Sequence, residues 1–174
     1  DFFEINVDGT INLIASAHKN KIQMLIHTSS PSVGIPEEGV ENADENSPYP
    51  KRYLSYYAES KALAEKAVIA ASSSKLRTIA LRPHLIWGPG DPHILPRIIK
   101  MAKEKKLVRV GDGKNLVDMT YIDNAAEAHL LAAEKLRNSQ NLSGLKYFLS
   151  DDCPVNLWEW IDTFLKALDM PPVQ

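Results

Sequence analysis

The two most informative stretches are Tyr57-Ala58-Glu59-Ser60-Lys61 and the earlier Thr28-Ser29-Ser30. Residues four apart lie on the same side of a helix, so the Tyr57 phenol and the Lys61 ammonium face one space. A neighbouring cation favours the phenolate and lowers the pKa of a phenol from its ordinary value of about 10. A serine hydroxyl at the end of a strand, such as Ser30, can hold the oxygen whose proton the phenol gives or takes. This arrangement suits hydride transfer at an alcohol or a ketone.

A purely structural interpretation of the pair is also available. The chain has six tyrosines, and roughly half of all chains of this composition would contain one Tyr-x-x-x-Lys by chance. Tyr57 shares a helical stripe with Ala64 and Val68, as a packed core residue would. The motif therefore gains its weight from the elements around it.

Those elements form a crossover unit. Met24–Ile26, closed by polar residues 27–30, and residues 77–81, closed by Arg82-Pro83, are predicted strands of a parallel sheet. Between them lie a Pro-, Gly- and Asn-rich loop over residues 31–52 and the helix that carries Tyr57, which ends near Ala71. Ligands of parallel sheets bind beyond the carboxyl ends of the strands, so Ser30 and Pro83-His84-Leu85 are expected to flank one site. The fold class is α/β.

The remaining elements follow from periodicity and capping. We expect His27 and His129 to be packed residues and not ligands. Helices are predicted over residues 1–18 and 94–105, over a segment that runs from an N-cap at Asp123 to Leu136, and after a capping pair formed by Asn156 and Glu159. Strands are predicted over residues 107–110, 116–122 and 146–150, with a turn at Gly111-Asp112-Gly113.

Composition limits the classes of function. The 174 residues have a net charge of −2 and no basic stripe, which argues against nucleic acid and anionic membrane surfaces as partners. No apolar run approaches the ~18 residues of a membrane span. The single Cys153 excludes an internal disulfide and fits a reducing compartment, so a cytoplasmic location is expected. The five histidines show no metal-type spacing, so no metal is expected.

The positions of the glycines are also informative. None of the eight glycines forms the glycine-rich turn between a strand and a helix that binds a pyrophosphate. If the protein binds a dinucleotide, we expect its phosphate-binding half upstream of Asp1 and treat the chain as a fragment. Residues 1–92 would then be the C-terminal half of the dinucleotide-binding domain. Residues 93–174 would be interleaved substrate-side elements, together with the last strand of the sheet at about 145–150.

The chain resembles the extended short-chain dehydrogenase/reductase family, within the NAD-dependent epimerase/dehydratase superfamily, and specifically its 3β-hydroxysteroid dehydrogenase branch. Five segments in the family's order carry the resemblance: NVDGTINLIASA, MLIHTSSPSVG, YAESKALAEKAV, LRPHLIWGPGDPHILPR and GDGKNLVDMTYIDNAAEAHLLAAEKL. Within the branch, the wording is most similar to sterol-4α-carboxylate 3-dehydrogenases and to bacterial 2-alkyl-3-oxoalkanoate reductases, with a slight preference for the latter. The resemblance implies a Rossmann-like doubly wound parallel sheet and a role in steroid or lipid metabolism.

The resemblance also implies roles for individual residues. Tyr57 would be the general acid/base, Lys61 would lower its pKa and hold the nicotinamide ribose, and Ser30 would bind the reacting oxygen, with Ser29 as a second candidate. The backbone of Pro83, His84 and Leu85 would contact the nicotinamide carboxamide. Asn6 matches a helix position near the active site without an assigned role. His84 and Arg97 are candidates for binding a substrate carboxylate.

The implied function is an NAD- or NADP-dependent oxidoreductase that interconverts a secondary alcohol and a ketone. Its substrate would be small and apolar or lipid-like, such as a β-hydroxy/β-keto acid or a 3β-hydroxysteroid, and the protein could form a homodimer. One alternative is a nucleotide-sugar epimerase or dehydratase, but Val117-Asp118 stands where such enzymes usually carry an arginine for the pyrophosphate. The other alternative is a non-catalytic NAD(P)-binding regulator. Such proteins tend to lose the Tyr or the Lys, and both residues are present here.

Overall fold

The computed structural model of the chain describes residues 1–36 and 43–173. The predicted loop residues 37–42 lie outside the described residues. The chain divides into two compact units. The first comprises Asp1–His84 and Ala126–Leu149, and the second comprises Leu85–Ala125 and Ser150–Gln174.

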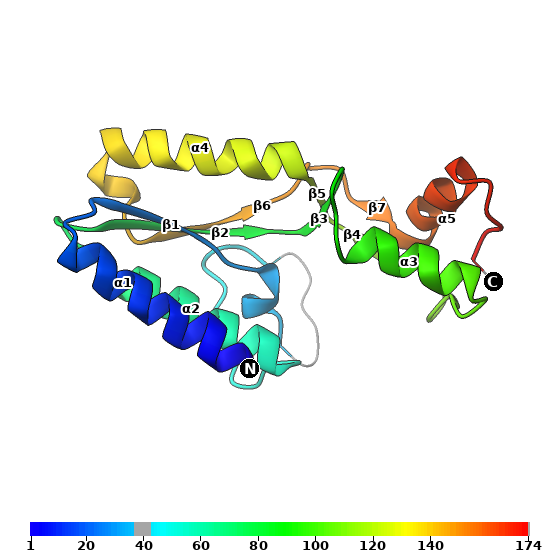
Figure 1. Cartoon of the computed structure of the whole chain (residues 1–174), viewed down its shortest axis with the longest axis horizontal. Helices are drawn as coiled ribbons and strands as arrows, with labels where there is room; N and C mark the ends of the chain where they lie inside the picture. Colours follow the sequence, from blue (N-terminus) through cyan, green and yellow to red (C-terminus); the bar gives the residue numbers. More distant parts are fainter. Residues whose placement is uncertain (37–42, 174) are drawn as a thin grey trace. The chain divides into compact units, whose positions relative to one another are not determined.

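A three-stranded parallel sheet forms the centre of the first unit, in the order β1-β2-β6 (Figure 1). The strands are β1 (Met24–Thr28), β2 (Arg77–Pro83) and β6 (Leu145–Leu149). Ile26 lies opposite Ile79, and Leu81 lies opposite Tyr147. Because all three strands run in the same direction, the residues that follow β1 and β2 come to the same edge of the sheet.

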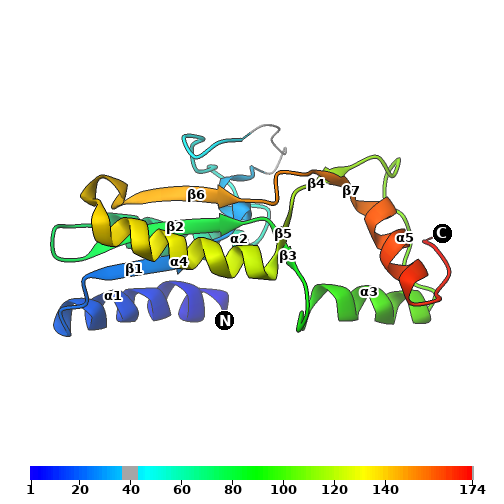
Figure 2. The same cartoon turned by 90° about the horizontal axis from the view of Figure 1, so that it is seen from above.

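Helices cover both faces of this sheet, which confirms the predicted α/β doubly wound class (Figures 1 and 2). On one face lie α1 (Gly9–Lys19), which continues a short π-helical start at Glu4–Asp8, and α2 (Tyr56–Ala70). On the other face lies α4 (Ile122–Asn138), which is followed by a 3-10 turn at Gln140–Leu142 and leads into β6.

The two faces differ in chemistry. On the side of α4, buried Ile79, Leu81 and Leu136 form an apolar cluster. On the side of α2, the helix presents buried alanines, which allow a close approach, together with the buried side chain of Glu65. The Glu65 carboxylate pairs with Arg82 of β2. A buried ion pair therefore lies between α2 and the sheet.

Two small sheets, two whole helices and the first turn of α4 make up the described part of the second unit. The strand β3 (Leu85–Trp87) runs parallel to β5 (Met119–Tyr121), and β4 (Leu116–Val117) runs antiparallel to β7 (Val155–Asn156). The core of this unit comes mainly from α5 (Leu157–Ala167), with partly buried residues of α3 (Ile94–Lys103) against it. Its buried members are Trp158, Ile161, Leu165 and Val173.

The predicted capping of α5 is confirmed, because the Asn156 side chain accepts hydrogen bonds from the backbone N–H groups of Trp158 and Glu159. The N-cap predicted at Asp123 is wrong. Strand β5 ends at Tyr121 and α4 begins at Ile122, so Asp123 lies inside the first helical turn.

The strand predicted over residues 107–110 is also wrong, since these residues have no regular structure. Strand β7 pairs with Leu116–Val117 instead, and Val108 and Val110 are exposed. The predicted turn is present, and Gly111 and Gly113 both have positive φ angles. Within the described part of the chain, no helix is both long enough and apolar enough to cross a membrane.

Candidate functional site

Helix α2 begins with a well-formed cap that fixes the position of Tyr57. Ser55 has an extended backbone, and its hydroxyl accepts a hydrogen bond from Ala58 N–H at 3.2 Å. Tyr57 therefore lies in the first helical turn, and its side chain is 40% exposed. Its ring meets the ring of Phe2 edge-on, with centroids 5.8 Å apart. The Tyr57 phenol thus lies at the N-terminal end of α2.

Lys61, one turn further along α2, reaches the carboxyl end of β1. Its ammonium donates a hydrogen bond of 2.6 Å to the backbone carbonyl of Thr28, the last residue of that strand. Partial burial lowers the pKa of Lys61, and the negative charge of Glu65 opposes this effect. The structure thus places a cation at the strand end from which Ser29 and Ser30 follow.

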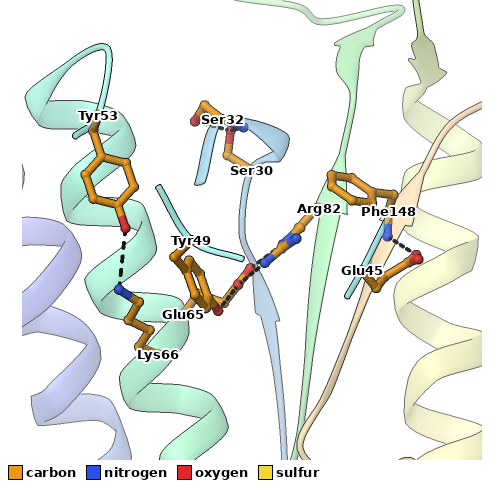
Figure 3. Close-up of polar contacts among 9 residues, drawn as sticks. All are labelled: Ser30, Ser32, Glu45, Tyr49, Tyr53, Glu65, Lys66, Arg82 and Phe148. Carbon is orange, nitrogen blue, oxygen red and sulfur yellow. Dashed lines mark hydrogen bonds and ion pairs between the residues drawn. The ribbon is translucent and has the colours of Figure 1, made fainter. Parts of the chain in front are cut away.

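Ser30 lies just beyond this strand end, at the cap of a 3-10 turn over Pro31–Gly34. Its hydroxyl accepts a hydrogen bond from Ser32 N–H at 3.3 Å and is 2.8 Å from the Ser32 hydroxyl (Figure 3). The neighbouring Ser29 is buried, and its N–H donates to the Leu81 carbonyl at 2.6 Å. The local fold therefore fixes the backbone and the hydroxyl of Ser30.

Asn6 connects the start of the first helix to α2. Its side-chain amide donates to the Ser60 hydroxyl at 3.0 Å, and that hydroxyl donates to the Tyr57 carbonyl at 2.9 Å. Because Ser60 is fully buried, these two hydrogen bonds fix the backbone of Tyr57 relative to Asn6.

The predicted cofactor and substrate residues divide between the two units. Pro83 ends β2 opposite Leu149, and His84 donates its backbone N–H to the Leu149 carbonyl at 2.9 Å. Both belong to the first unit, together with Ser30, Tyr57 and Lys61. Leu85 opens β3 in the second unit, and Arg97 is an exposed residue of α3 in that unit.

A polar cluster that was not predicted from the sequence lies beneath α2. Glu65 and Arg82 form a fully buried ion pair, and the Tyr49 hydroxyl donates to the same carboxylate (Figure 3). Two signals pointed to it: Glu65 continues the spacing of four that starts with Tyr57 and Lys61, and Arg82 interrupts an apolar strand. Neither signal identifies the partner of either residue.

His27 belongs to the same layer. Burial, and then the positive charge of Lys61, lower its pKa from 6.5 to about 4, although Glu65 acts in the opposite direction. The imidazole is therefore neutral at pH 7. Its partial burial on β1 agrees with the expectation that His27 is a packed strand residue.

Comparison with known proteins extends these observations. The sequence profile of the 3-beta hydroxysteroid dehydrogenase/isomerase family matches residues 1–174. A 2-alkyl-3-oxoalkanoate reductase of Shewanella oneidensis is 44% identical over 99% of this chain and 46% of its own length. The human sterol-4-alpha-carboxylate 3-dehydrogenase (decarboxylating) is 37% identical over 97% of this chain and 46% of its own length. The chain thus spans about half the length of the relatives that it matches.

Solved structures give the same fold. A UDP-galactose 4-epimerase superposes with a TM-score of 0.79 at 21% identity, covering 99% of this chain and 57% of its own. The UDP-glucose 4-epimerase of Thermus thermophilus, solved in complex with NAD, superposes with a TM-score of 0.71 at 28% identity, with the same coverage of both chains. The order of strands and helices is therefore shared with proteins of the epimerase/dehydratase group.

Proposed function

The chain belongs to the 3-beta hydroxysteroid dehydrogenase/isomerase family, and on that premise we propose that it carries the catalytic residues of an NAD(P)-dependent oxidoreductase. The reaction would interconvert a secondary alcohol and a ketone on an apolar substrate. One observation supports this most strongly: the Lys61 ammonium is fixed 2.6 Å from the last carbonyl of β1, one helical turn from Tyr57.

In this proposal Tyr57 is the general acid/base. Lys61 favours the phenolate because a fixed cation stabilises the charged form of a neighbouring acid. In the oxidation direction, Tyr57 takes the proton of the substrate hydroxyl; in the reduction direction it returns that proton to the oxygen. Ser30 holds the same oxygen by a hydrogen bond. The Asn6–Ser60 chain keeps the Tyr57 backbone in place during the reaction.

The residues at this strand end fit a nicotinamide cofactor. The Lys61 ammonium suits ribose hydroxyls, since it has three N–H donors and Thr28 uses one of them. The backbone at Pro83 and His84, continuing to Leu85, would contact the carboxamide. When bound, NAD or NADP accepts or supplies the hydride at the carbinol carbon.

The names of the relatives indicate the substrate class. One is a reductase of 2-alkyl-3-oxoalkanoates, and the other is a dehydrogenase of sterol-4-alpha-carboxylates. Both names describe an oxygen function at position 3 next to a carbon that bears a carboxylate and an apolar body. We therefore propose a β-hydroxy/β-keto acid, or a 3β-hydroxysteroid-like compound, as the substrate. His84 is the first candidate to bind its carboxylate, and Arg97 is the second.

The remaining assignments extend the same proposal. Residues 1–92, which include Ser30, Tyr57 and Lys61, would be the C-terminal half of the dinucleotide-binding domain, and residues 93–174 would be the substrate-side elements together with the last strand of the sheet. Cys153 is free and exposed, which fits the reducing conditions of the cytoplasm. A homodimer is the proposed assembly.

A substrate panel tests the proposal. The intact protein is mixed with NADH or NADPH and, separately, a 2-alkyl-3-keto acid, a 3-ketosteroid and a UDP-sugar, and cofactor oxidation is followed. We expect oxidation with the keto acid or the ketosteroid. The matched control is the 2-alkyl acid without the 3-keto group, which should give none. Conversion of the UDP-sugar alone would identify an epimerase or dehydratase, and cofactor binding without any turnover would identify a regulator.

A further inference from the structure

Glu65 and Arg82 form a two-pronged ion pair between α2 and β2. The Arg82 Nε donates to one carboxylate oxygen of Glu65 at 2.9 Å, and a terminal nitrogen donates to the other at 2.6 Å (Figure 3). The side chains are 0% and 1% exposed, respectively. Paired N–H···O bonds of this kind fix orientation as well as distance.

The pair lies between two parts of the proposed site. Glu65 follows Lys61 by four residues and Tyr57 by eight, so all three occupy one side of α2. Arg82 directly precedes Pro83 and belongs to the strand whose end is proposed to meet the nicotinamide. A shift of this ion pair would therefore move the acid/base helix relative to that strand.

Glu65 is held in its charged form. Burial alone favours the neutral acid, but hydrogen bonds from Arg82 and Tyr49 keep the pKa of Glu65 below its ordinary value. The guanidinium also lies over the rings of Tyr49 and Phe148, at 5.6 and 5.1 Å from their centroids. A full negative charge is thus fixed one helical turn from Lys61.

That charge acts on the Lys61 ammonium. Partial burial lowers the pKa of Lys61, and Glu65 raises it. Other titratable groups also face this region: His27 on β1, Arg82 on β2, Lys146 on β6, Tyr49 and Glu45 on the loop before α2, and Tyr57 and Lys66 on α2 itself. From the π-helical start and α1, which also pack on α2, the titratable side chains are Glu4, Asp8, His18 and Lys19, and all four are exposed.

We propose that Glu65 is a positioning residue for the Tyr57–Lys61 pair: its ion pair with Arg82 sets α2 against the end of β2 and fixes a carboxylate one helical turn from Lys61. This inference rests on the proposed function. Stability alone is a weak reason for such a pair, because a buried ion pair can often be replaced by apolar residues without loss.

The test uses the double variant Glu65→Gln, Arg82→Gln in the intact protein. Glu65→Gln alone would leave a buried guanidinium without a counter-charge, which is strongly destabilising, whereas the double variant leaves two neutral amides that can bond to each other. With the preferred keto substrate, we expect kcat to fall by about 10-fold or more, because misplacing an acid/base group by ~1 Å costs up to about 100-fold. KM is expected to change by less than about 3-fold, since substrate binding does not use the pair.

A readout independent of activity separates this inference from the proposed function. The rate at which acetic anhydride labels Lys61, followed by mass spectrometry across pH, reports the pKa of that amine in the intact protein. We expect the apparent pKa to be lower by about 0.5 unit or more in the double variant than in the native protein. The matched control is Glu59→Gln, the same substitution on the same helix, which should change neither kcat nor the labelling profile.

Two results would overturn the inference. One is a folded double variant with native kcat and a native Lys61 labelling profile. The other is a native kcat in Glu65→Asp, a variant that covers the case in which the double variant does not fold. Glu65→Asp keeps the charge but shortens the side chain by one methylene, so it should lower kcat while leaving the Lys61 profile unchanged. If the native protein reduces none of the panel substrates, the proposed function fails, and the labelling comparison still tests the effect of Glu65 on Lys61.

Discussion

The Lys61 ammonium donates a 2.6 Å hydrogen bond to the backbone carbonyl of Thr28. This bond connects a cation on α2 to the last residue of β1 and so places it at the carboxyl edge of the parallel sheet. Because ligands of such sheets bind at this edge, the cation lies where a proton-handling group is useful. Its removal should therefore affect turnover directly.

Replacing Lys61 should impair proton handling more than folding. In Lys61→Met the site loses the cation that is proposed to favour the Tyr57 phenolate. We expect kcat for alcohol oxidation to fall by about 100-fold. Steady-state turnover of the intact protein measures this loss. Lys66→Met, on the same helix, is the control; an equal loss in that variant would show that the effect is not specific to Lys61.

Substitutions can distinguish the roles of Ser29 and Ser30, the two serines after β1. Ser30→Ala removes the hydroxyl proposed to hold the reacting oxygen, and kcat/KM should fall by about 10- to 100-fold. Ser30→Thr keeps a hydroxyl and should recover part of the activity. Ser29→Ala should cost less than Ser30→Ala in the same assay. The reverse order would assign the role to Ser29.

His27 makes stability depend on pH. Its pKa is 6.5 in an unfolded chain and about 4 in the folded protein, so the unfolded state binds the proton first as the pH falls. The free energy of unfolding should therefore decrease between pH 6.5 and pH 4, by on the order of 2 kcal/mol from this residue. Urea denaturation across this range measures it. His27→Gln should remove that part of the slope, whereas His18→Gln, at an exposed position, should not; equal slopes in native protein and His27→Gln would contradict the assignment.

Gly88 is required at its position in the second unit. Its φ angle is +144°, and a Cβ there would lie 2.5 Å from the Cγ2 atom of Ile122. Gly88→Ala should lower the free energy of unfolding by about 2 to 4 kcal/mol, from backbone strain and overpacking together. Gly90 also has a positive φ angle, but a Cβ there meets nothing within 4 Å, so Gly90→Ala should cost about 1 kcal/mol. Similar losses in the two variants would show that the contact with Ile122 does not matter.

Local patterns predicted much of this fold. A clear hydrophobic periodicity and clear end signals mark three elements: the strand Met24–Thr28, the helix that carries Tyr57 and Lys61, and the strand that ends at Pro83. The order of these elements implied a parallel sheet. Residues 107–110 looked like a strand, but a strand needs a partner, and the available partner pairs with Leu116–Val117. Asp123 looked like a cap, but β5 runs into α4 without a linker.

The candidate site was predictable to a similar degree. Residues of one helix, such as Tyr57 and Lys61, are related by a fixed spacing, so their proximity could be expected. The Glu65–Arg82 pair joins residues 17 apart across a helix and a strand, and no local rule states which buried charge meets which. The contact of Lys61 with Thr28 likewise depends on the packing of α2 against β1. These contacts are set by tertiary packing, so local sequence patterns could not predict them.

The central claim is that the Tyr57 phenol carries the proton of the reacting oxygen, and adjacent tyrosines allow a direct test. Steady-state turnover of the intact protein with its preferred keto substrate is compared between Tyr57→Phe and Tyr56→Phe, the same substitution one residue apart. Tyr56 is 73% exposed, with its ring against Phe3, and has no proposed role. We predict that kcat falls by about 100- to 10,000-fold in Tyr57→Phe and stays within about 2-fold in Tyr56→Phe. Native turnover in a folded Tyr57→Phe variant would contradict the account.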